Sequence, residues 1–256
     1  MPQAVMSSNL RVLASRGAYS ADLPDDKPVI NNPLENAPPE TQPYNEKYAA
    51  ALKECQVVFY CTHSAESYIP DSGVAKCEGQ RGLVNQVADT LARELNRAGI
   101  QAVFNDTIHD FPEYNYSYTN SRETVKNTIK KYPHLVALFD IHRDSIPGRE
   151  DAETINVNGK DAALILIVVG TDERKPHPNW RKNLAFAEKI RNKGEEIYPG
   201  LIKGVRSKAG TYNQEFFDHA LLLEFGTDRN SLQEVTYAAQ LFTNILLDVL
   251  YEEVSS

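Results

Sequence analysis

Three short apolar runs of the sequence end in side chains that could do chemistry. His63 and Glu66 follow the first run and are three residues apart, His142 ends the second, and Glu224 ends the third. A catalytic zinc ion takes three protein ligands, commonly histidine and carboxylate, and leaves one position open for water. His63, Glu66 and His142 therefore predict a site for one Zn²⁺ ion. A single histidine at a strand end is more often simply half-buried, so the prediction depends on the set.

Glu224 has a different setting from Glu66. Four apolar residues, 220–223, precede it, and Phe225 and Gly226 follow. Burial raises the pKa of a carboxyl group, which suits a general base that takes a proton from water and returns it to a leaving group. The alternative is a structural ion pair with an arginine such as Arg143, because buried charges usually have partners.

Further residues are candidates for binding substrate. Arg143 could hold a substrate carboxylate or an oxyanion, with an ordinary ion pair as the alternative. Asp140 lies on the same strand face as His142 and could orient it, or cap a neighbouring loop. A polar, aromatic segment, residues 106–122, contains His109 and Tyr116, which could line a substrate groove or be exposed or packed under a loop.

The elements that position these residues alternate between strands and helices from residue 51 onward. This alternation predicts an α/β fold, a three-layer sandwich with a central mixed, mainly parallel sheet flanked by helices. Open parallel sheets place their ligands at the carboxyl edge, where the three runs end. Residues 162–170 are expected to form a strand buried on both faces. We expect loops at residues 145–160 and 200–211.

The two ends of the chain differ in composition. Residues 1–50 are rich in proline and polar residues and predict an N-terminal arm or linker, and residues 51–256 predict the catalytic domain. The first 16 residues do not have the pattern of a signal peptide, and no apolar stretch reaches the roughly 20 residues that span a bilayer. We therefore expect no transmembrane segment in this sequence.

Composition also excludes some functions. The formal net charge is −8 and the pI is about 5.3, so the chain lacks the basic surface that follows a phosphate backbone, and nucleic acid is not an expected partner. Three cysteines without paired spacing predict neither a disulfide framework nor a cysteine-type zinc site.

An ordered set of short motifs resembles a known family. The motifs are Thr62-His63-Ser64-Ala65-Glu66-Ser67-Tyr68, Thr107-Ile108-His109-Asp110, Tyr114-Asn115-Tyr116-Ser117-Tyr118, Asp140-Ile141-His142-Arg143-Asp144, Val168-Val169-Gly170-Thr171, His177-Pro178-Asn179-Trp180, Tyr198-Pro199-Gly200-Leu201, Tyr212-Asn213-Gln214 and Leu223-Glu224-Phe225-Gly226. Each motif is weak alone, but together and in this order they are specific. The chain resembles the stage II sporulation protein P family of cell-wall amidases.

The resemblance implies a zinc amidase fold and a zinc-dependent N-acetylmuramoyl-L-alanine amidase. His63 and His142 match the family's metal histidines, Glu224 its catalytic glutamate, and Glu66 the third ligand. The wider zinc amidases instead take a glutamate from the start of the next helix, which would point to Glu78. The substrate implied is peptidoglycan, whose stem peptides would be released during engulfment in sporulation, with cutting of peptide cross-links as a second activity.

The resemblance further implies partners and a location. The partners are the stage II sporulation proteins D and M, and the location is extracytoplasmic, at the septal or engulfing membrane and cell wall. The motifs also contain Asp144, His109, Tyr116 and Trp180, which we expect to bind substrate. Cys61 stands where members often have another histidine, and the usual N-terminal anchor is not recognisable in this sequence.

Two other functions stay open from the residues. A zinc carboxypeptidase-like peptidase would use the same ligands and base, with a pocket closed around a free carboxylate. A catalytically silent wall-binding module is the alternative of another class. The presence of His63, Glu66, His142 and Glu224 together argues against the silent module.

Overall fold

The structure is a computed structural model that describes residues 46–255. The N-terminal arm predicted for residues 1–50 therefore lies outside the described residues except for its last five positions. Those positions belong to helix α1 (Glu46–Leu52), which packs against the C-terminal helix α6 (Leu232–Ser255). Within residues 46–255, no helix is long and apolar enough to span a membrane.

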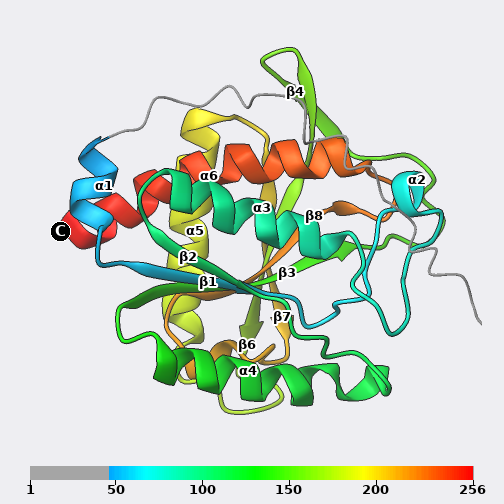
Figure 1. Cartoon of the computed structure of the whole chain (residues 1–256), viewed down its shortest axis with the longest axis horizontal. Helices are drawn as coiled ribbons and strands as arrows, with labels where there is room; N and C mark the ends of the chain where they lie inside the picture. The colour runs from blue at the N-terminus through cyan, green and yellow to red at the C-terminus, as the bar shows by residue number, and fades with distance from the viewer. Residues whose placement is uncertain (1–45, 256) are drawn as a thin grey trace, which may run out of the picture. The chain divides into compact units, whose positions relative to one another are not determined.

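A six-stranded sheet forms the centre of the fold (Figure 1). Its strands are β1 (Gln56–Tyr60), β2 (Gln101–Asn105), β3 (Leu135–Asp144), β6 (Ile165–Thr171), β7 (Ile202–Ala209) and β8 (Ala220–Thr227). The order across the sheet is β2-β1-β3-β8-β6-β7. The first four strands are parallel, β6 is antiparallel to β8, and β7 is parallel to β6. The predicted mixed, mainly parallel sheet is confirmed.

Helices cover both faces of this sheet. Helices α3 (Val84–Arg97), α5 (Trp180–Ile197) and α6 pack on one face, where their apolar residues share one large core with the sheet. Helix α4 (Ser117–Lys131) packs on the other face through Val125, which contacts residues of β1, β3 and β8. The three-layer α/β sandwich predicted from the sequence is therefore confirmed. The remaining helices are short: α2 (Ile69–Ser72) and the 3₁₀ turns Tyr114–Tyr116 and Gln214–Phe216.

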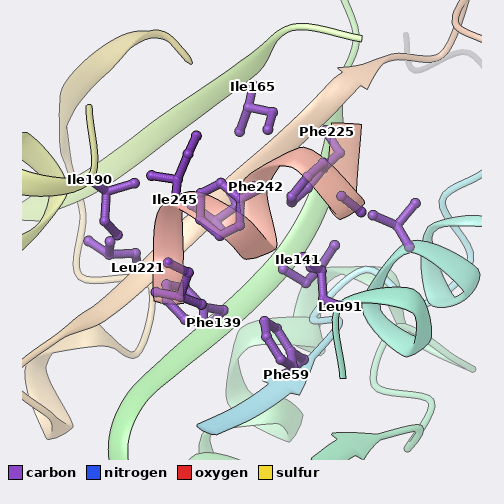
Figure 2. Packing of buried hydrophobic residues seen from close by; sticks show 14 of the residues in the cluster. Phe59, Leu91, Phe139, Ile141, Ile165, Ile190, Leu221, Phe225, Phe242 and Ile245 are labelled. Carbon is purple, nitrogen blue, oxygen red and sulfur yellow. The ribbon is translucent and has the colours of Figure 1, made fainter. Parts of the chain in front are cut away.

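Aromatic packing marks the centre of the large core (Figure 2). Phe242 of α6 is fully buried, and its ring meets Phe225 of β8 and Phe139 of β3 edge to face at centroid distances of 5.7 and 6.2 Å. Alternate residues of a strand point to opposite faces, so the neighbours of Phe225 on β8 point away from this core. Glu224 is one of them, and it lies on the face that carries α4.

Two segments expected to be loops contain strands. Residues 145–160 include β4 (Thr154–Val157), which forms an antiparallel hairpin with β5 (Lys160–Ala163), and residues 200–211 include the edge strand β7. β7 pairs on one side only, and it carries a glycine at position 204 and exposed charged residues. These features weaken the strand pattern in the sequence. The single strand expected over residues 162–170 is divided between β5 and β6.

The aromatic cluster gives a stability prediction. Replacing Phe242 with alanine should lower the free energy of unfolding by about 3–5 kcal/mol, because a large buried side chain is lost and a cavity remains. Replacing Tyr116, whose side chain is exposed, should change it by less than about 0.5 kcal/mol. Urea unfolding of both variants measures the difference, and equal effects would contradict the assigned core.

Candidate active site

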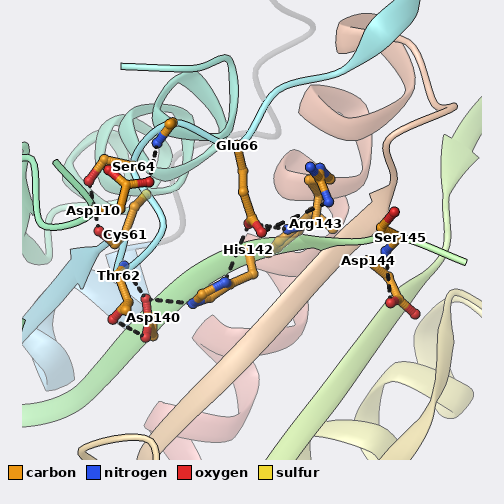
Figure 3. Close-up of polar contacts among 12 residues, drawn as sticks. Cys61, Thr62, Ser64, Glu66, Asp110, Asp140, His142, Arg143, Asp144 and Ser145 are labelled. Atoms are coloured by element: carbon orange, nitrogen blue, oxygen red, sulfur yellow. Dashed lines mark hydrogen bonds and ion pairs between the residues drawn. The ribbon is translucent and has the colours of Figure 1, made fainter. Parts of the chain in front are cut away.

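The loop after β1 is folded so that His63 and Glu66 lie together. The backbone N–H of Glu66 donates to the carbonyl of His63 at 3.0 Å, which closes a turn. Asp140 of β3 holds the start of this turn, since its carboxylate accepts the Thr62 N–H at 2.7 Å and the Thr62 hydroxyl at 2.6 Å (Figure 3). The turn that carries His63 and Glu66 is thus fixed to strand β3.

Two further contacts fix the end of the turn. The carboxylate of Asp110 accepts the backbone N–H of Ala65 at 2.9 Å. Gly82 packs so closely that a Cβ atom at this position would lie 2.0 Å from the carbonyl oxygen of Glu66. A side chain at position 82 would therefore displace the backbone of Glu66.

His142 and Glu224 reach the same place from adjacent strands. They are partners in the parallel register of β3 and β8, so their side chains lie side by side on one face of the sheet. Nδ1 of His142 lies 3.4 Å from a carboxylate oxygen of Glu66, and Nε2 lies 3.0 Å from Asp140. The rings of His63 and His142 are 5.3 Å apart and nearly perpendicular. The structure thus brings together all four residues predicted for the reaction centre.

These side chains line a cavity of about 470 Å³. His63, Glu66, His142 and Glu224 form one part of its wall, and Val168 and Leu222 form an apolar part. The cavity is large enough for a sugar or a peptide unit to reach the four polar residues.

Burial controls the protonation of His63 and Glu224. Burial, together with the neighbouring His142, lowers the pKa of His63 to about 4. Burial raises the pKa of Glu224 to about 7, although His142 opposes the rise. Near neutral pH His63 is therefore an uncharged imidazole that can donate a lone pair, and Glu224 can both accept and release a proton.

Charged neighbours control the protonation of His142 and Glu66. Burial alone would lower the pKa of His142, but the carboxylates of Asp140 and Glu66 raise it well above its usual value. Burial alone would raise the pKa of Glu66, yet the contacts with His142 and Arg143 lower it. Glu66 is thus ionised in a buried place, which is the state a metal-binding carboxylate needs.

The donor set fits a zinc ion, whose binding would displace the proton that the carboxylates of Asp140 and Glu66 hold on His142. Within residues 46–255, no three His, Cys, Asp or Glu side chains are arranged around a common point as metal ligands are. However, Nδ1 of His63 is buried and has no hydrogen-bond partner, beside the Glu66 and His142 side chains. The Asp140 carboxylate on the far nitrogen of His142 is the usual way to orient a zinc-binding histidine.

The geometry also bears on the third ligand. Glu66 is buried, lines the cavity and contacts His142. Glu78 is exposed and does not line the cavity. The arrangement therefore favours Glu66 over Glu78.

Arg143 and Asp144 lie at the edge of this centre. Arg143 lines the cavity, but its side chain donates to the carbonyls of Ser67 at 3.3 Å and Ala75 at 2.8 Å, and its backbone N–H donates to Glu66 at 3.2 Å. These bonds hold the loop that follows Glu66. Asp144 also lines the cavity, and its carboxylate accepts the backbone N–H of Ser145.

The other predicted binding residues lie outside the cavity wall. His109 is buried, with its ring nitrogens 2.8 Å from the Cys61 carbonyl and 2.8 Å from the Thr124 hydroxyl. Tyr116 is exposed, and the ring of Trp180 packs against the guanidinium group of Arg181. A role for these three residues in substrate binding stays a prediction.

Sequence reasoning named the tyrosine-rich segment that contains Tyr114 as a possible part of the groove, but it missed Lys208 and Tyr212. Tyr114 stacks on the ring of His63 at a centroid distance of 4.5 Å, and the ammonium group of Lys76 lies 3.9 Å from the centre of the Tyr114 ring. Lys208 and Tyr212 line the cavity from β7 and the loop that follows it. The tyrosine-rich motif was a signal for Tyr114, whereas Lys208 lies in a segment expected to be a loop.

Comparison with known proteins identifies the family. The sequence model described as stage II sporulation protein P matches residues 13–247. The chain belongs to this family. It is 33% identical over 213 residues to stage II sporulation protein P of Bacillus subtilis (strain 168), and the match covers 77% of this chain. It spans about half, 52%, of the length of that relative.

Solved structures confirm the fold. The CwlD amidase of Clostridioides difficile, solved in complex with the GerS lipoprotein, is 12% identical, with a TM-score of 0.51, and the match covers 78% of this chain and 99% of that one. An N-acetylmuramoyl-L-alanine amidase of Clostridium difficile 630 is 15% identical, with a TM-score of 0.51 and coverages of 79% and 97%. This member of the stage II sporulation protein P family therefore has the amidase fold.

The buried carboxyl of Glu224 gives a prediction that does not depend on activity. Its folded pKa of about 7 lies above the ordinary value of 4.5. The folded state therefore keeps a proton that the unfolded state has lost, and stability falls as the pH rises from 4.5 through 7. Glu224→Gln in metal-free protein should raise the free energy of unfolding at pH 8 by about 1–3 kcal/mol.

Urea unfolding with chelator at pH 4.5 and pH 8 measures this effect. The gain from Glu224→Gln should nearly vanish at pH 4.5. At that pH the Glu224 carboxyl is protonated in the folded state and about half protonated in the unfolded state. The exposed Glu78→Gln is the matched control and should show no gain at either pH. A gain that is the same at both values would contradict the raised pKa.

Proposed function

We propose that this chain is a peptidoglycan hydrolase that cleaves the amide between N-acetylmuramic acid and the L-alanine of the stem peptide. The observation that carries the proposal is the placement of Glu224, a buried carboxyl with a pKa of about 7, beside His63, Glu66 and His142 in one cavity. Membership in the stage II sporulation protein P family and the amidase fold support it.

His63, Glu66 and His142 would hold one Zn²⁺ ion. When bound, the ion would polarise the amide carbonyl and lower the pKa of a water molecule at its open position. His63 offers an uncharged imidazole, and Glu66 offers a carboxylate that is ionised even though it is buried. Asp140 would keep the ring of His142 in the orientation that binding requires.

Glu224 moves the proton. One of its carboxylate oxygens, Oε2, is buried and has no hydrogen-bond partner within the described residues. It takes a proton from the attacking water, whose oxygen forms the new bond to the carbonyl carbon. As the carbon–nitrogen bond breaks, Glu224 returns this proton to the amine of L-alanine. A pKa near the working pH serves both transfers.

Arg143 and Asp144 support the reaction from the rim of the cavity. Arg143 lines the cavity and holds the loop after Glu66 through the carbonyls of Ser67 and Ala75, and its positive charge would favour the negative charge that develops in the cavity. Asp144 lines the cavity and is proposed to bind substrate.

The setting of the reaction follows from the substrate. Peptidoglycan lies outside the cytoplasm, so we propose an extracytoplasmic site of action during engulfment, in the septal region. Cutting of peptide cross-links and cooperation with stage II sporulation proteins D and M are further proposals, which rest on the family resemblance.

The test is mass spectrometry of the fragments released from purified peptidoglycan. The wild type with zinc should release intact stem peptides that begin with a free L-alanine amine, and a chelator should abolish release. Glu224→Gln should lower the rate about 10²–10⁴-fold, the usual contribution of a general base. Glu78→Gln is the control and should leave the rate unchanged.

Other products would identify the alternatives. Free C-terminal amino acids without intact stem peptides would indicate a carboxypeptidase. Stoichiometric zinc without any fragment, or neither zinc nor fragments, would reject autonomous hydrolysis and favour a binding module.

Asp140 gives a separate prediction about the metal. Asp140→Asn keeps the size of the side chain but removes its negative charge. The carboxylate that contacts His142 and accepts the hydrogen bond from the Thr62 hydroxyl is thereby lost. Zinc affinity should fall about 10–100-fold. Competition with a chromophoric chelator measures it, with the exposed Asp89→Asn as the control. An unchanged affinity in a folded Asp140→Asn variant would remove His142 from the proposed ligand set.

A further inference from the structure

Within residues 46–255, a helix covers only one half of the sheet face that carries Glu224. Val125 of α4 packs on residues of β1, β3 and β8. Leu166, Val168 and Leu222 form a separate small cluster that packs against Tyr212. The cavity extends over this second half, because Val168 and Leu222 belong to its wall. A substrate at Glu224 can therefore continue across β8 and β6 toward the edge strand β7.

Two cations stand at the end of this path. Lys208 of β7 lines the cavity, and Arg206 lies two residues before it on the same strand. Arg206 is the register partner of Val168, and Lys208 is the partner of Gly170. Alternate residues of a strand share a face, so Arg206 and Lys208 lie on the same face as Val168 and Glu224. Arg206 is exposed and Lys208 is half-buried.

Neither cation has an ion-pair partner among the described residues. Within residues 46–255, Lys208 and Arg206 form no ion pair, whereas Lys203 of the same strand pairs with Glu153. The whole chain has a net charge of −8, so this pair is not part of a generally basic surface. An unpaired ammonium group beside an apolar floor is suited to an anionic group on a ligand.

The chemical structure of peptidoglycan shows whether the glycan or the stem peptide carries a carboxylate near the scissile amide. The lactyl carboxyl of the sugar is consumed in the scissile amide, so the adjoining sugar brings no carboxylate. The stem peptide continues from the amide and carries free carboxylates. A cationic site beside the base therefore distinguishes the peptide side of the bond from the glycan side.

We propose that Lys208, supported by Arg206, binds a carboxylate of the stem peptide and so orients the substrate across β6 and β7. This inference rests on the proposed function of the same cavity. It places the peptide along the part of the cavity wall formed by Leu222, Val168 and Lys208, and the glycan toward Tyr114 and α4. It also makes Lys208 a determinant of specificity for acidic over amidated stem peptides.

The experiment compares two soluble muropeptides, one with free stem-peptide carboxylates and one with these carboxylates amidated. With the acidic substrate, Lys208→Met should raise KM about tenfold, the effect of losing one charge-assisted contact, and change kcat by less than about twofold. With the amidated substrate it should change neither constant. Lys208→Arg keeps the charge and should stay within about twofold of the wild type on the acidic substrate.

Lys203→Met is the matched control, because Lys203 lies on the same strand but pairs with Glu153. It should leave both constants unchanged on both substrates. Circular dichroism and melting temperature show whether each variant is folded. If Lys208→Met raises KM equally for both muropeptides, or changes only kcat, then Lys208 does not bind a carboxylate of the substrate and the inference is wrong.

A binding measurement separates this inference from the proposed function. Calorimetry gives the Kd of both muropeptides for Glu224→Gln and for Glu224→Gln combined with Lys208→Met. The inference is supported if the double variant binds the acidic muropeptide more weakly than Glu224→Gln does, while both proteins bind the amidated muropeptide equally. This result would stand even if the wild type cleaved neither substrate, and absence of cleavage would reject the proposed hydrolysis. Equal binding by both proteins overturns the inference even if the wild type is an active amidase.

Discussion

The carboxylate of Asp140 is the interaction on which the candidate site depends. It is buried, and it accepts both the backbone N–H and the hydroxyl of Thr62 while contacting Nε2 of His142. A buried carboxylate is costly unless several donors surround it, and here the donors are parts of the site itself. The loop that carries His63 and the strand that carries His142 are thereby fixed to each other. Neither histidine can move independently of this carboxylate.

The same network reaches the opposite wall of the cavity. The Thr62 hydroxyl lies 2.9 Å from the hydroxyl of Ser121 in α4, which accepts the side-chain N–H of Asn213 at 3.0 Å. Asn213 and its neighbour Tyr212 both have positive φ, at 59° and 53°. Non-glycine residues seldom adopt this conformation, and here buried side-chain hydrogen bonds maintain it. The hydrogen bonds of Asn213 therefore hold the turn that places Tyr212 in the cavity wall.

The sequence predicted which side chains meet in the cavity better than it predicted their surroundings, for a physical reason. His63 follows the buried strand β1, and His142 and Glu224 come directly after apolar residues near the carboxyl ends of β3 and β8, so the local pattern alone marks these positions. Lys208 could not be predicted in this way, because β7 is an edge strand with a weak pattern and its position depends on pairing with β6. His109 was ambiguous as a polar residue in an aromatic loop. Its hydrogen bonds to the Cys61 carbonyl and the Thr124 hydroxyl depend on tertiary contacts that no spacing reveals.

The direction of β6 and β7 explains why, within residues 46–255, no helix covers the β6–β7 half of the sheet face that carries Glu224. Right-handed crossovers place α3, between β1 and β2, and α4, between β2 and β3, on opposite faces, because the two connections move across the sheet in opposite directions. The connection from β6 through α5 to β7 moves the same way as that through α4, but its strands run in reverse. The same handedness therefore places α5 on the face of α3 and α6, where Ile190 and Phe186 are buried. Among the described helices of the sandwich, only α4 is left for the other face, and it covers the β1–β3 half. A sheet with six parallel strands in this order would put a helix over β6 and β7, so the reversal of two strands leaves room for the cavity beside Glu224.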